Sequence, residues 1–181
     1  MISSYTAVVG SRQLPPCAAE AVKVLVAGIL QNPGAGIVSG GAMGADHFAI
    51  RALLELGECP RGLIVTPWRG FEGFPSSIRK DIQRFAAQGG QIEWGLVPTL
   101  TNRAQVIAGL FGRNSRLIRR AGAVAAIPHG TCNGTAYTIR RAQEHGIPVT
   151  IYSWDETAKK LKPERIPERA MQISLFQHSP A

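Results

Sequence analysis

Residues 36–56 have the sequence GIVSGGAMGADHFAIRALLEL, and this stretch decides the fold. Gly36 to Ser39 is a short apolar run that predicts a buried strand. Ala45 to Leu56 has apolar residues at helical spacing and is followed by Gly57, which is typical of a helix end. Between them lies a glycine-rich turn, SGGAMGAD. A strand, a glycine-rich loop and a helix in this order are typical of a phosphate-binding βα unit.

The rest of the chain continues this alternation. Further strands are expected at 5–9, 63–66, 92–97, 123–127 and 149–152, and further helices at 18–30, 76–87 and 136–145. Residues 101–120 are expected to form a helix in two pieces, broken near Gly112. Strands alternating with helices predict βαβ units with right-handed crossovers and a mostly parallel sheet. The predicted fold is a Rossmann-like α/β domain, with helices on both faces of the sheet in three αβα layers.

Length and composition fit one domain. The chain has 181 residues, of which 45% are hydrophobic, enough for a core. The character changes after residue 153, because KKLKPERIPER at 159–169 is charged and interrupted by proline. We therefore expect a domain over 1–153, followed by a mobile linker and tail over 154–181.

The charge is strongly one-sided. The formal net charge is +8, and no acidic residue lies between Leu96 and Gln143. Such a stretch favours an anionic partner, nucleic acid or nucleotide, over a merely solvated surface or a membrane. The expected nucleic-acid face consists of Arg116, Arg119, Arg120, Arg140 and Arg141.

The cysteines point to a reducing compartment. The chain has three cysteines, Cys17, Cys59 and Cys132, and they lie far apart in the sequence. An odd number at wide spacing predicts free thiols rather than disulfides or a zinc site. The first residues lack the pattern of a signal peptide, and no apolar run reaches the length of a membrane span. We expect a cytoplasmic protein that binds no metal or cofactor.

Three loops at equivalent positions form the expected site. Gly10-Ser11-Arg12 follows the first strand, the SGGAMGAD turn follows the second, and Gly130-Thr131-Cys132-Asn133-Gly134-Thr135 follows the strand at 123–127. Carboxyl ends of parallel strands share one edge, and glycines with helix N-termini present N–H groups to phosphate. The alternative is that the glycines only make tight turns. Three such loops together favour binding.

Several side chains extend this prediction. Arg12 is expected to project into the crevice. Arg113 offers a guanidinium group that can bind phosphate, and Asn114 offers an amide that can bind a sugar hydroxyl or a base edge. The alternatives are surface charge for Arg12 and Arg113 and a helix cap for Asn114. Asp46 either complements its helix dipole or binds a ribose hydroxyl, and the sequence favours neither. Trp68, Phe71 and Phe74 either stack bases or plug the end of the sheet.

The segments GSR (10–12), SGGAMGAD (39–46), RN (113–114) and NGTAYTIRRAQEHGIPV (133–149), in this order, resemble the DNA-processing protein A family (DprA or Smf) within the SLOG superfamily, over about residues 5–152. The resemblance implies a Rossmann-like pocket that holds nucleotide phosphates or, in DprA proteins, single-stranded DNA, and helps to load a recombinase. With the third loop included, the expected pocket residues are Gly10, Ser11, Arg12, Ser39, Gly40, Gly41, Gly44, Asp46, Arg113, Asn114, Gly130, Asn133, Gly134 and Thr135. By analogy, a homodimer is also expected.

One departure concerns catalysis. LOG-type phosphoribohydrolases of the superfamily carry a GT-x-x-E pattern with a catalytic glutamate, and here Thr138 stands at that position. The nearby alternatives are His129 and His145, both interpreted as structural or surface residues, and Glu72 and Glu144, neither well placed. The sequence leaves activity open and favours binding without catalysis.

The tail carries a separate signal. Gln172-Ile173-Ser174-Leu175-Phe176 resembles the peptide with which bacterial replication and repair proteins bind the DNA polymerase sliding clamp. Leu175 and Phe176 are suitable apolar anchors and Gln172 a suitable polar contact. The alternative is that they pack back on the domain.

The leading hypothesis is therefore a DprA-like protein of DNA processing and recombination, which binds single-stranded DNA and is recruited to the clamp. The alternatives are a nucleotide-binding sensor and a phosphoribohydrolase acting on nucleoside monophosphates. The first predicts a steep dependence of affinity on salt.

Overall fold

The computed structural model describes residues 2, 4–98 and 102–164. Within them, seven strands form one sheet in the order β4-β3-β2-β1-β5-β6-β7. Their bounds are Ser4–Gly10 (β1), Ala35–Ser39 (β2), Gly62–Val65 (β3), Gln91–Glu93 (β4), Ala121–Ile127 (β5), Val149–Asp155 (β6) and Lys160–Glu164 (β7). β1 to β6 are mutually parallel, and β7 is antiparallel to β6.

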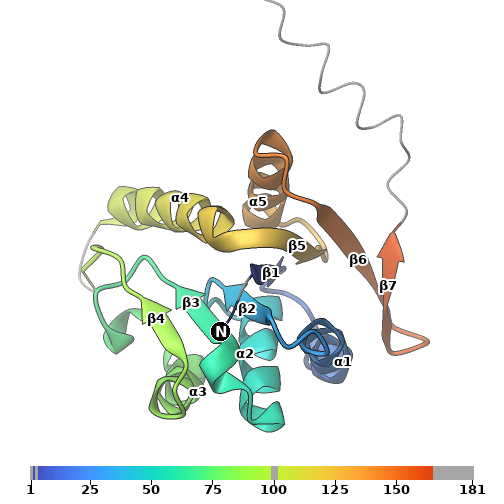
Figure 1. Ribbon diagram of the computed structural model, residues 1–181. Coiled ribbons are helices and arrows are strands. Elements are labelled where there is room, and N and C mark those ends of the chain that lie inside the picture. The colour runs from blue at the N-terminus through green and yellow to red at the C-terminus, as the bar shows by residue number, and fades with distance from the viewer. Residues whose placement is uncertain (1, 3, 99–101, 165–181) are drawn as a thin grey trace, which may run out of the picture.

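Five α-helices of the described residues cover both faces of the sheet. They are Ala19–Leu30 (α1), Ala45–Leu56 (α2), Ser76–Ala87 (α3), Arg103–Arg120 (α4) and Asn133–Glu144 (α5). Figure 1 shows α4 and α5 on one face and α1, α2 and α3 on the other. This confirms the predicted single Rossmann-like domain with three αβα layers.

The central strands show why the sequence folds this way. Side chains of a strand point alternately to its two faces. In β1, Val8 belongs to the apolar cluster under α1, α2 and α3, whereas Ala7 and Val9 belong to the cluster under α4 and α5. A strand buried on both faces needs apolar residues at consecutive positions, which is the pattern of a parallel sheet.

The order of the strands places a crevice beside β1. The chain runs from β1 outward through β2 and β3 to β4, and then returns across the sheet to β5 on the other side of β1. Gly10 and Ile127 are partners at the carboxyl ends of β1 and β5. Such a reversal of strand order is where open α/β sheets bind ligands.

The predicted break in the helix near Gly112 is wrong, because α4 is one helix of 18 residues. Gly112 is exposed, and no atom approaches the position of its missing Cβ. A glycine in a helix costs about 1 kcal/mol relative to alanine, which the packing of the C-terminal half of α4 outweighs. Leu117 and Ile118 provide that packing in the core.

The predicted linker from residue 155 is also wrong as far as Glu164. β7 pairs with β6 over Asp155↔Lys160 to Ile151↔Glu164. Asp155 accepts hydrogen bonds from the N–H groups of Thr157 and Ala158, which closes the hairpin. The charged sequence was misleading because lysine and proline are common on edge strands, where they prevent further pairing. Residues 165–181 lie outside the described residues.

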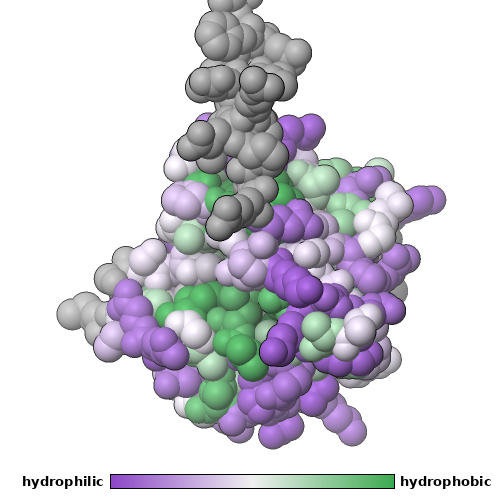
Figure 2. Space-filling view, turned by 90° about the vertical axis from the view of Figure 1, so that its right-hand side faces the viewer, coloured by the Kyte–Doolittle hydropathy of each residue, from purple (hydrophilic) through white to green (hydrophobic). Residues whose placement is uncertain are grey.

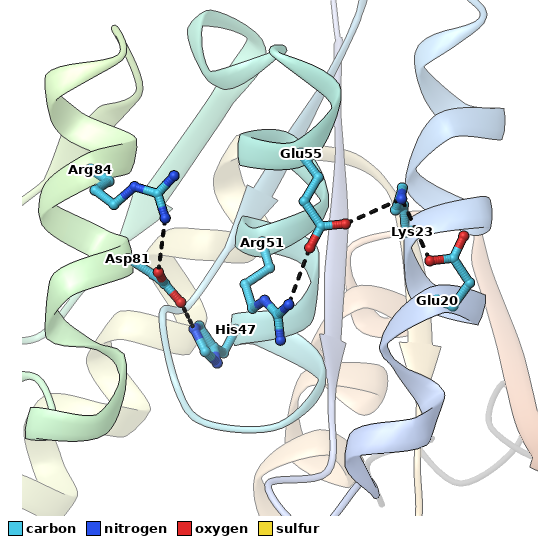
Figure 3. A network of polar contacts seen from close by, with 7 residues as sticks. All are labelled: Glu20, Lys23, His47, Arg51, Glu55, Asp81 and Arg84. Atoms are coloured by element: carbon cyan, nitrogen blue, oxygen red, sulfur yellow. Dashed lines mark hydrogen bonds and ion pairs between the residues drawn. The ribbon is translucent and has the colours of Figure 1, made fainter.

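The layer of α1, α2 and α3 is joined at its surface by polar contacts (Figure 3). Glu55 of α2 pairs with Lys23 of α1 at 3.2 Å, and His47 of α2 contacts Asp81 of α3 at 2.8 Å. The hydrogen bond from Lys23 is the largest influence that lowers the pKa of Glu55. These contacts lie on the layer opposite to α4 and α5.

The side of the molecule formed by α1 and β7 has an apolar area (Figure 2). On α1, Val24 is 65% exposed and Leu25 and Ile29 are half-buried, as is Leu161 of β7. Among the described residues, no helix combines the length and apolar character needed to cross a bilayer.

Candidate functional site

A cavity of about 420 Å³ lies at the carboxyl ends of β1 and β5, with α4 and α5 contributing its walls. It brings together most of the residues expected in the pocket: Gly10, Ser11, Arg12, Asp46, Arg113, Asn114, Asn133, Gly134 and Thr135. The expected residues Ser39, Gly40, Gly41, Gly44 and Gly130 are not part of its lining. Two of these glycines, described below, shape the site from behind.

The first loop ties β1 to its neighbours. The N–H of Ser11 donates to the carbonyl of Ile127 at 3.0 Å, and its carbonyl accepts from the N–H of Ala45 at 3.2 Å. The Ser11 hydroxyl accepts from the N–H of Gln13 at 3.1 Å. Ser11 is therefore bonded internally, whereas the next residue, Arg12, is exposed and lines the cavity.

The second loop holds a buried ion pair that the sequence did not predict. Asp46 is 4% exposed and lies 3.5 Å from the Nη1 atom of Arg113, which is 7% exposed. The same carboxylate accepts from the N–H of Ala42 at 3.3 Å. Burial raises the pKa of Asp46, and the charge of Arg113 is the largest influence that opposes this rise. Asp46 is thus the internal counterion of Arg113, rather than the cap of its helix.

Gly40 makes room for this ion pair. A Cβ at Gly40 would lie 1.3 Å from Nη1 of Arg113 and 2.7 Å from Oδ2 of Asp46. Gly44 has a φ of +75°, and a Cβ there would lie 2.2 Å from the carbonyl oxygen of Ser11. Both glycines are needed for close approach, as tight turns require.

The third loop opens the N-terminus of α5 to the cavity. Within the part of the chain that the structure describes, no group accepts a hydrogen bond from the N–H of Asn133, Gly134 or Thr135. Cys132 gives no side-chain cap, and the first turn has no acidic residue. In contrast, the first N–H of α2 is already taken by Ser11. The positive end of α5 is therefore available to an anion.

Arginine adds further unused donors. Nε of Arg113 is buried and has no hydrogen-bond partner among the described residues. A buried donor without a partner is costly and points to an acceptor that completes it. Of the cavity's lining residues, Asp46 is the one acid, and it is paired with Arg113. The cavity therefore offers donors and positive charge to a ligand.

One face of α4 forms the remaining wall. Ile107, Leu110, Phe111 and Asn114 follow the spacing of a helix face and all line the cavity. Asn114 is 9% exposed, whereas Ile107 and Phe111 are 42% and 44% exposed. The wall is polar at the buried end and apolar at the outer end.

The expected aromatic residues have another role. Phe74 is 1% exposed, and both Phe71 and Phe74 make edge-to-face contacts with Trp94. Trp68 and Phe71 pack against the core. Phe74 is therefore too buried to stack a base, and the packing of half-buried Trp68 and Phe71 favours the alternative of a plug at the end of the sheet.

The arginines of the expected nucleic-acid face lie outside the cavity. Arg116 and Arg120 both pair with Glu93, and Arg140 and Arg141 both pair with Glu144. Arg116 also donates to the carbonyl oxygens of Thr66 and Trp94, which ties α4 to the sheet. Arg119 is exposed. The acid-free stretch is thus neutralised in part by acids just outside it.

The model of the DNA recombination-mediator protein A family matches residues 2–174. The protein belongs to this family. No curated protein matches the chain. Membership confirms the resemblance to the DNA-processing protein A family.

Two solved structures of DNA processing protein A are similar to this member of the recombination-mediator family. The Helicobacter pylori protein, solved in work on its single-stranded DNA binding mode, is 24% identical with a TM-score of 0.63, and the match covers 83% of this chain and 65% of that one. The Streptococcus pneumoniae protein is 21% identical with a TM-score of 0.59, and the match covers 83% and 50%. These likenesses show the fold.

In this recombination-mediator family member, the residue at the LOG-type glutamate position has a structural contact. The hydroxyl of Thr138 donates to the carbonyl of Gly134 at 2.9 Å, one turn earlier in α5, and the residue is 3% exposed. The other residues weighed for catalysis, His129, His145, Glu72 and Glu144, do not line the cavity.

Sequence reasoning missed two features of the site. The Asp46–Arg113 pair joins residues 67 positions apart, so no local pattern signals it. Phe111 contacts Tyr137 of α5 edge to face, with ring centroids 4.8 Å apart. The helical spacing of Ile107, Phe111 and Asn114 was a signal for this wall, but the predicted break at Gly112 obscured it.

Proposed function

We propose that this recombination mediator binds single-stranded DNA by holding backbone phosphate in the cavity between β1, β5, α4 and α5. The observation that carries the proposal is the open N-terminus of α5, which lines the same cavity as Arg12 and Arg113. In addition, the buried Nε of Arg113 has no hydrogen-bond partner among the described residues. Charge-assisted hydrogen bonds from arginine and backbone N–H groups are the usual means of holding phosphate.

The size and composition of the cavity support one nucleotide unit of a longer strand. Its volume of about 420 Å³ lies within the range of ligand pockets. The polar end, at Asn114 and Arg113, suits the phosphate and sugar, and the apolar outer end suits a base. The Helicobacter pylori protein was solved in work on its single-stranded DNA binding mode, which favours the same ligand class here.

A mononucleotide would fit the same cavity, which keeps a nucleotide-binding sensor as the second candidate. The two functions differ in their dependence on length. A strand gains affinity from phosphates outside the cavity, where Arg119 is exposed, and the gain falls steeply with salt. A sensor binds a mononucleotide as tightly as an oligonucleotide, and its affinity depends weakly on salt.

The test is fluorescence anisotropy with labelled oligo-dT, a duplex of the same length and unlabelled mononucleotides as competitors. Arg12→Ala is the informative variant, because Arg12 is exposed and its side chain is not part of the buried core. Arg51→Ala is the matched control, an arginine with a 48% exposed side chain on the opposite layer.

We expect Arg12→Ala to weaken binding of oligo-dT and to reduce the slope of log affinity against log salt by about 0.7, the value for one phosphate contact in a single strand. Arg51→Ala is expected to leave both nearly unchanged. Equal losses in the two variants, or no binding of oligo-dT at low salt, would refute the proposal.

We also propose that the tail segment Gln172 to Phe176 binds the sliding clamp; it lies outside the described residues, and the proposal rests on its sequence alone. The test is pull-down by the clamp with and without the double substitution Leu175→Ala and Phe176→Ala. A homodimer stays a prediction, to be checked by sedimentation equilibrium. Clamp binding that survives the double substitution would contradict the role of the tail.

A further inference from the structure

We propose that Cys132 is a modification site, whose thiol takes up an anionic disulfide from solution and thereby closes the cavity to phosphate. The reagent belongs to the class of small disulfides whose two halves carry carboxylate groups. The reaction itself rests on the chemistry of the cavity, whereas its effect on DNA binding rests on the proposed function.

The first observation is the place of Cys132. It lies directly before α5, lines the cavity and is partly exposed. Its carbonyl accepts from the N–H of Ala136 at 3.1 Å, as expected of a residue that begins a helix. Its side chain, however, caps no N–H group of α5 in the described part of the chain. The thiol is therefore not committed to the helix, and a reagent in the cavity can reach it.

The second observation concerns the donors around this thiol, which select the charge of the reagent. Arg113 is 7% exposed and lines the same cavity, and its Nε has no hydrogen-bond partner among the described residues. Arg12 is exposed on the same lining, whereas Asp46, the one acid there, is paired with Arg113. Together with the open end of α5, these groups attract carboxylates as they attract phosphate. Such a field raises the rate at which anions arrive by about 10- to 1000-fold.

The other two cysteines lack this combination. Cys59 is 1% exposed, and burial raises the pKa of its thiol, which disfavours the reactive thiolate. Cys17 is exposed and lies directly before α1, which Figure 1 shows on the opposite face of the sheet from α5. Lys159 lies 4.0 Å from its Sγ, but the cavity beside it also holds acids, and Glu55 there already pairs with two of its cations. Cys17 is thus an accessible thiol in a setting of mixed charge.

The step is an ordinary thiol–disulfide exchange. The thiolate of Cys132 attacks one sulfur of the reagent, an S–S bond to Cys132 forms, and the S–S bond of the reagent breaks. The sulfur of Cys132 is oxidised and the departing half leaves as a reduced thiolate, so the reagent is the whole oxidant. The half that stays places its carboxylates beside the N-terminus of α5, where phosphate is proposed to lie. A dithiol reductant reverses the step, as expected of a regulatory disulfide in a reducing compartment.

The experiment compares two disulfides of opposite charge. Oxidised glutathione carries more carboxylates than ammonium groups, and cystamine carries ammonium groups only. The Cys17→Ser protein is incubated with each, and modification of Cys132 is followed by intact mass and peptide mapping. The ratio of the two rates is divided by the same ratio in the urea-unfolded protein, which removes the intrinsic reactivity of the reagents.

We expect this normalised preference of Cys132 for oxidised glutathione to be at least about 10-fold at low salt and to fall at high salt. Arg12→Ala is expected to reduce the preference, and oligo-dT is expected to slow the reaction. Arg51→Ala, on the opposite layer, is expected to leave it unchanged. A preference at Cys132 no larger than that of Cys17 in the Cys132→Ser protein would overturn the inference.

The effect on DNA separates this inference from the proposed function. Glutathione on Cys132 is expected to abolish binding of oligo-dT, and reduction is expected to restore it, whereas glutathione on Cys17 is expected to leave binding unchanged. If Cys132 shows the charge preference but its modification leaves oligo-dT binding intact, the modification site stands and the cavity is not the DNA site. If oligo-dT binding depends on Arg12 but Cys132 shows no preference, phosphate binding stands and the modification site falls.

Discussion

The substitution Gly40→Ala tests the packing behind the cavity with a single methyl group. Gly40 lies between β2 and α2, outside the cavity, and its backbone conformation is one that alanine adopts without strain. The added Cβ would lie 1.3 Å from Nη1 of Arg113, so the guanidinium has to leave its place. The added Cβ also lies 2.7 Å from Oδ2 of Asp46, so the substitution acts on both partners of the Asp46–Arg113 pair.

The size of the effect follows from burial. Asp46 is 4% exposed, and displacement of Arg113 leaves it without its counterion. Breaking a buried ion pair costs about 3–5 kcal/mol, a large part of the stability of a domain. Affinity for oligo-dT is expected to fall as well, by about 1.5–3 kcal/mol, the net contribution of a hydrogen bond to a charged group.

The assay is urea unfolding, followed by anisotropy on samples that are folded in buffer. Gly28→Ala is the matched control, because Gly28 is an exposed residue of α1 and nothing lies within 4 Å of its missing Cβ. That control is expected to gain about 0.5–1 kcal/mol from the helix preference of alanine. If Gly40→Ala unfolds within 1 kcal/mol of the wild type and binds oligo-dT normally, the ion pair does not hold the site together.

Three further predictions concern the same site and its support. Burial raises the pKa of Asp46 above its ordinary 3.8, so the folded state holds this proton more tightly than the unfolded chain. The stability from Asp46 is complete below pH 3.8 and is lost as the pH rises through the raised folded value, and Asp46→Asn is expected to abolish this slope in urea unfolding at a series of pH values. Asn133→Asp places a negative charge at the open N-terminus of α5. This charge is expected to raise the free energy of unfolding by about 0.3–1 kcal/mol, because it complements the helix dipole, and to weaken oligo-dT binding, because it repels phosphate. Tighter binding of oligo-dT, measured by anisotropy, would count against the site. Arg116→Ala removes donors to two carbonyl oxygens and to Glu93. It is expected to lower the free energy of unfolding by about 1–3 kcal/mol and to change oligo-dT affinity less than Arg12→Ala does. A larger loss of affinity in Arg116→Ala than in Arg12→Ala would indicate that Arg116 binds DNA.

The layered fold was predictable because each element carries its own local signal. α2 and α3 begin and end where the helical spacing predicted, and the consecutive apolar residues of β1 and β5 required burial on both faces. The two errors, the break in α4 and the linker over β7, have a common cause. Tertiary contacts overrode weak local preferences: packing of Leu117 and Ile118 in one case and pairing with β6 in the other.

The meeting of the loops was predictable from topology, but the division of roles among them was not. Parallel strands bring their carboxyl ends to one edge, so the first and third loops had to meet there. Whether a glycine-rich loop offers free N–H groups depends on contacts between distant residues. In the second loop, the N–H of Ala45 donates to the carbonyl of Ser11 and the N–H of Ala42 donates to the carboxylate of Asp46, so neither N–H is free for a ligand. The N–H groups at the N-terminus of α5, in contrast, have no acceptor among the described residues.

The most direct test of the account is a ¹H–¹⁵N NMR titration of the protein with oligo-dT. We expect the amide signals of Asn133, Gly134 and Thr135 and the Nε–H signal of Arg113 to shift together and more than any others. If those signals stay fixed while amides of α1, α2 and α3 shift, the strand binds the opposite layer and the cavity is not the DNA site.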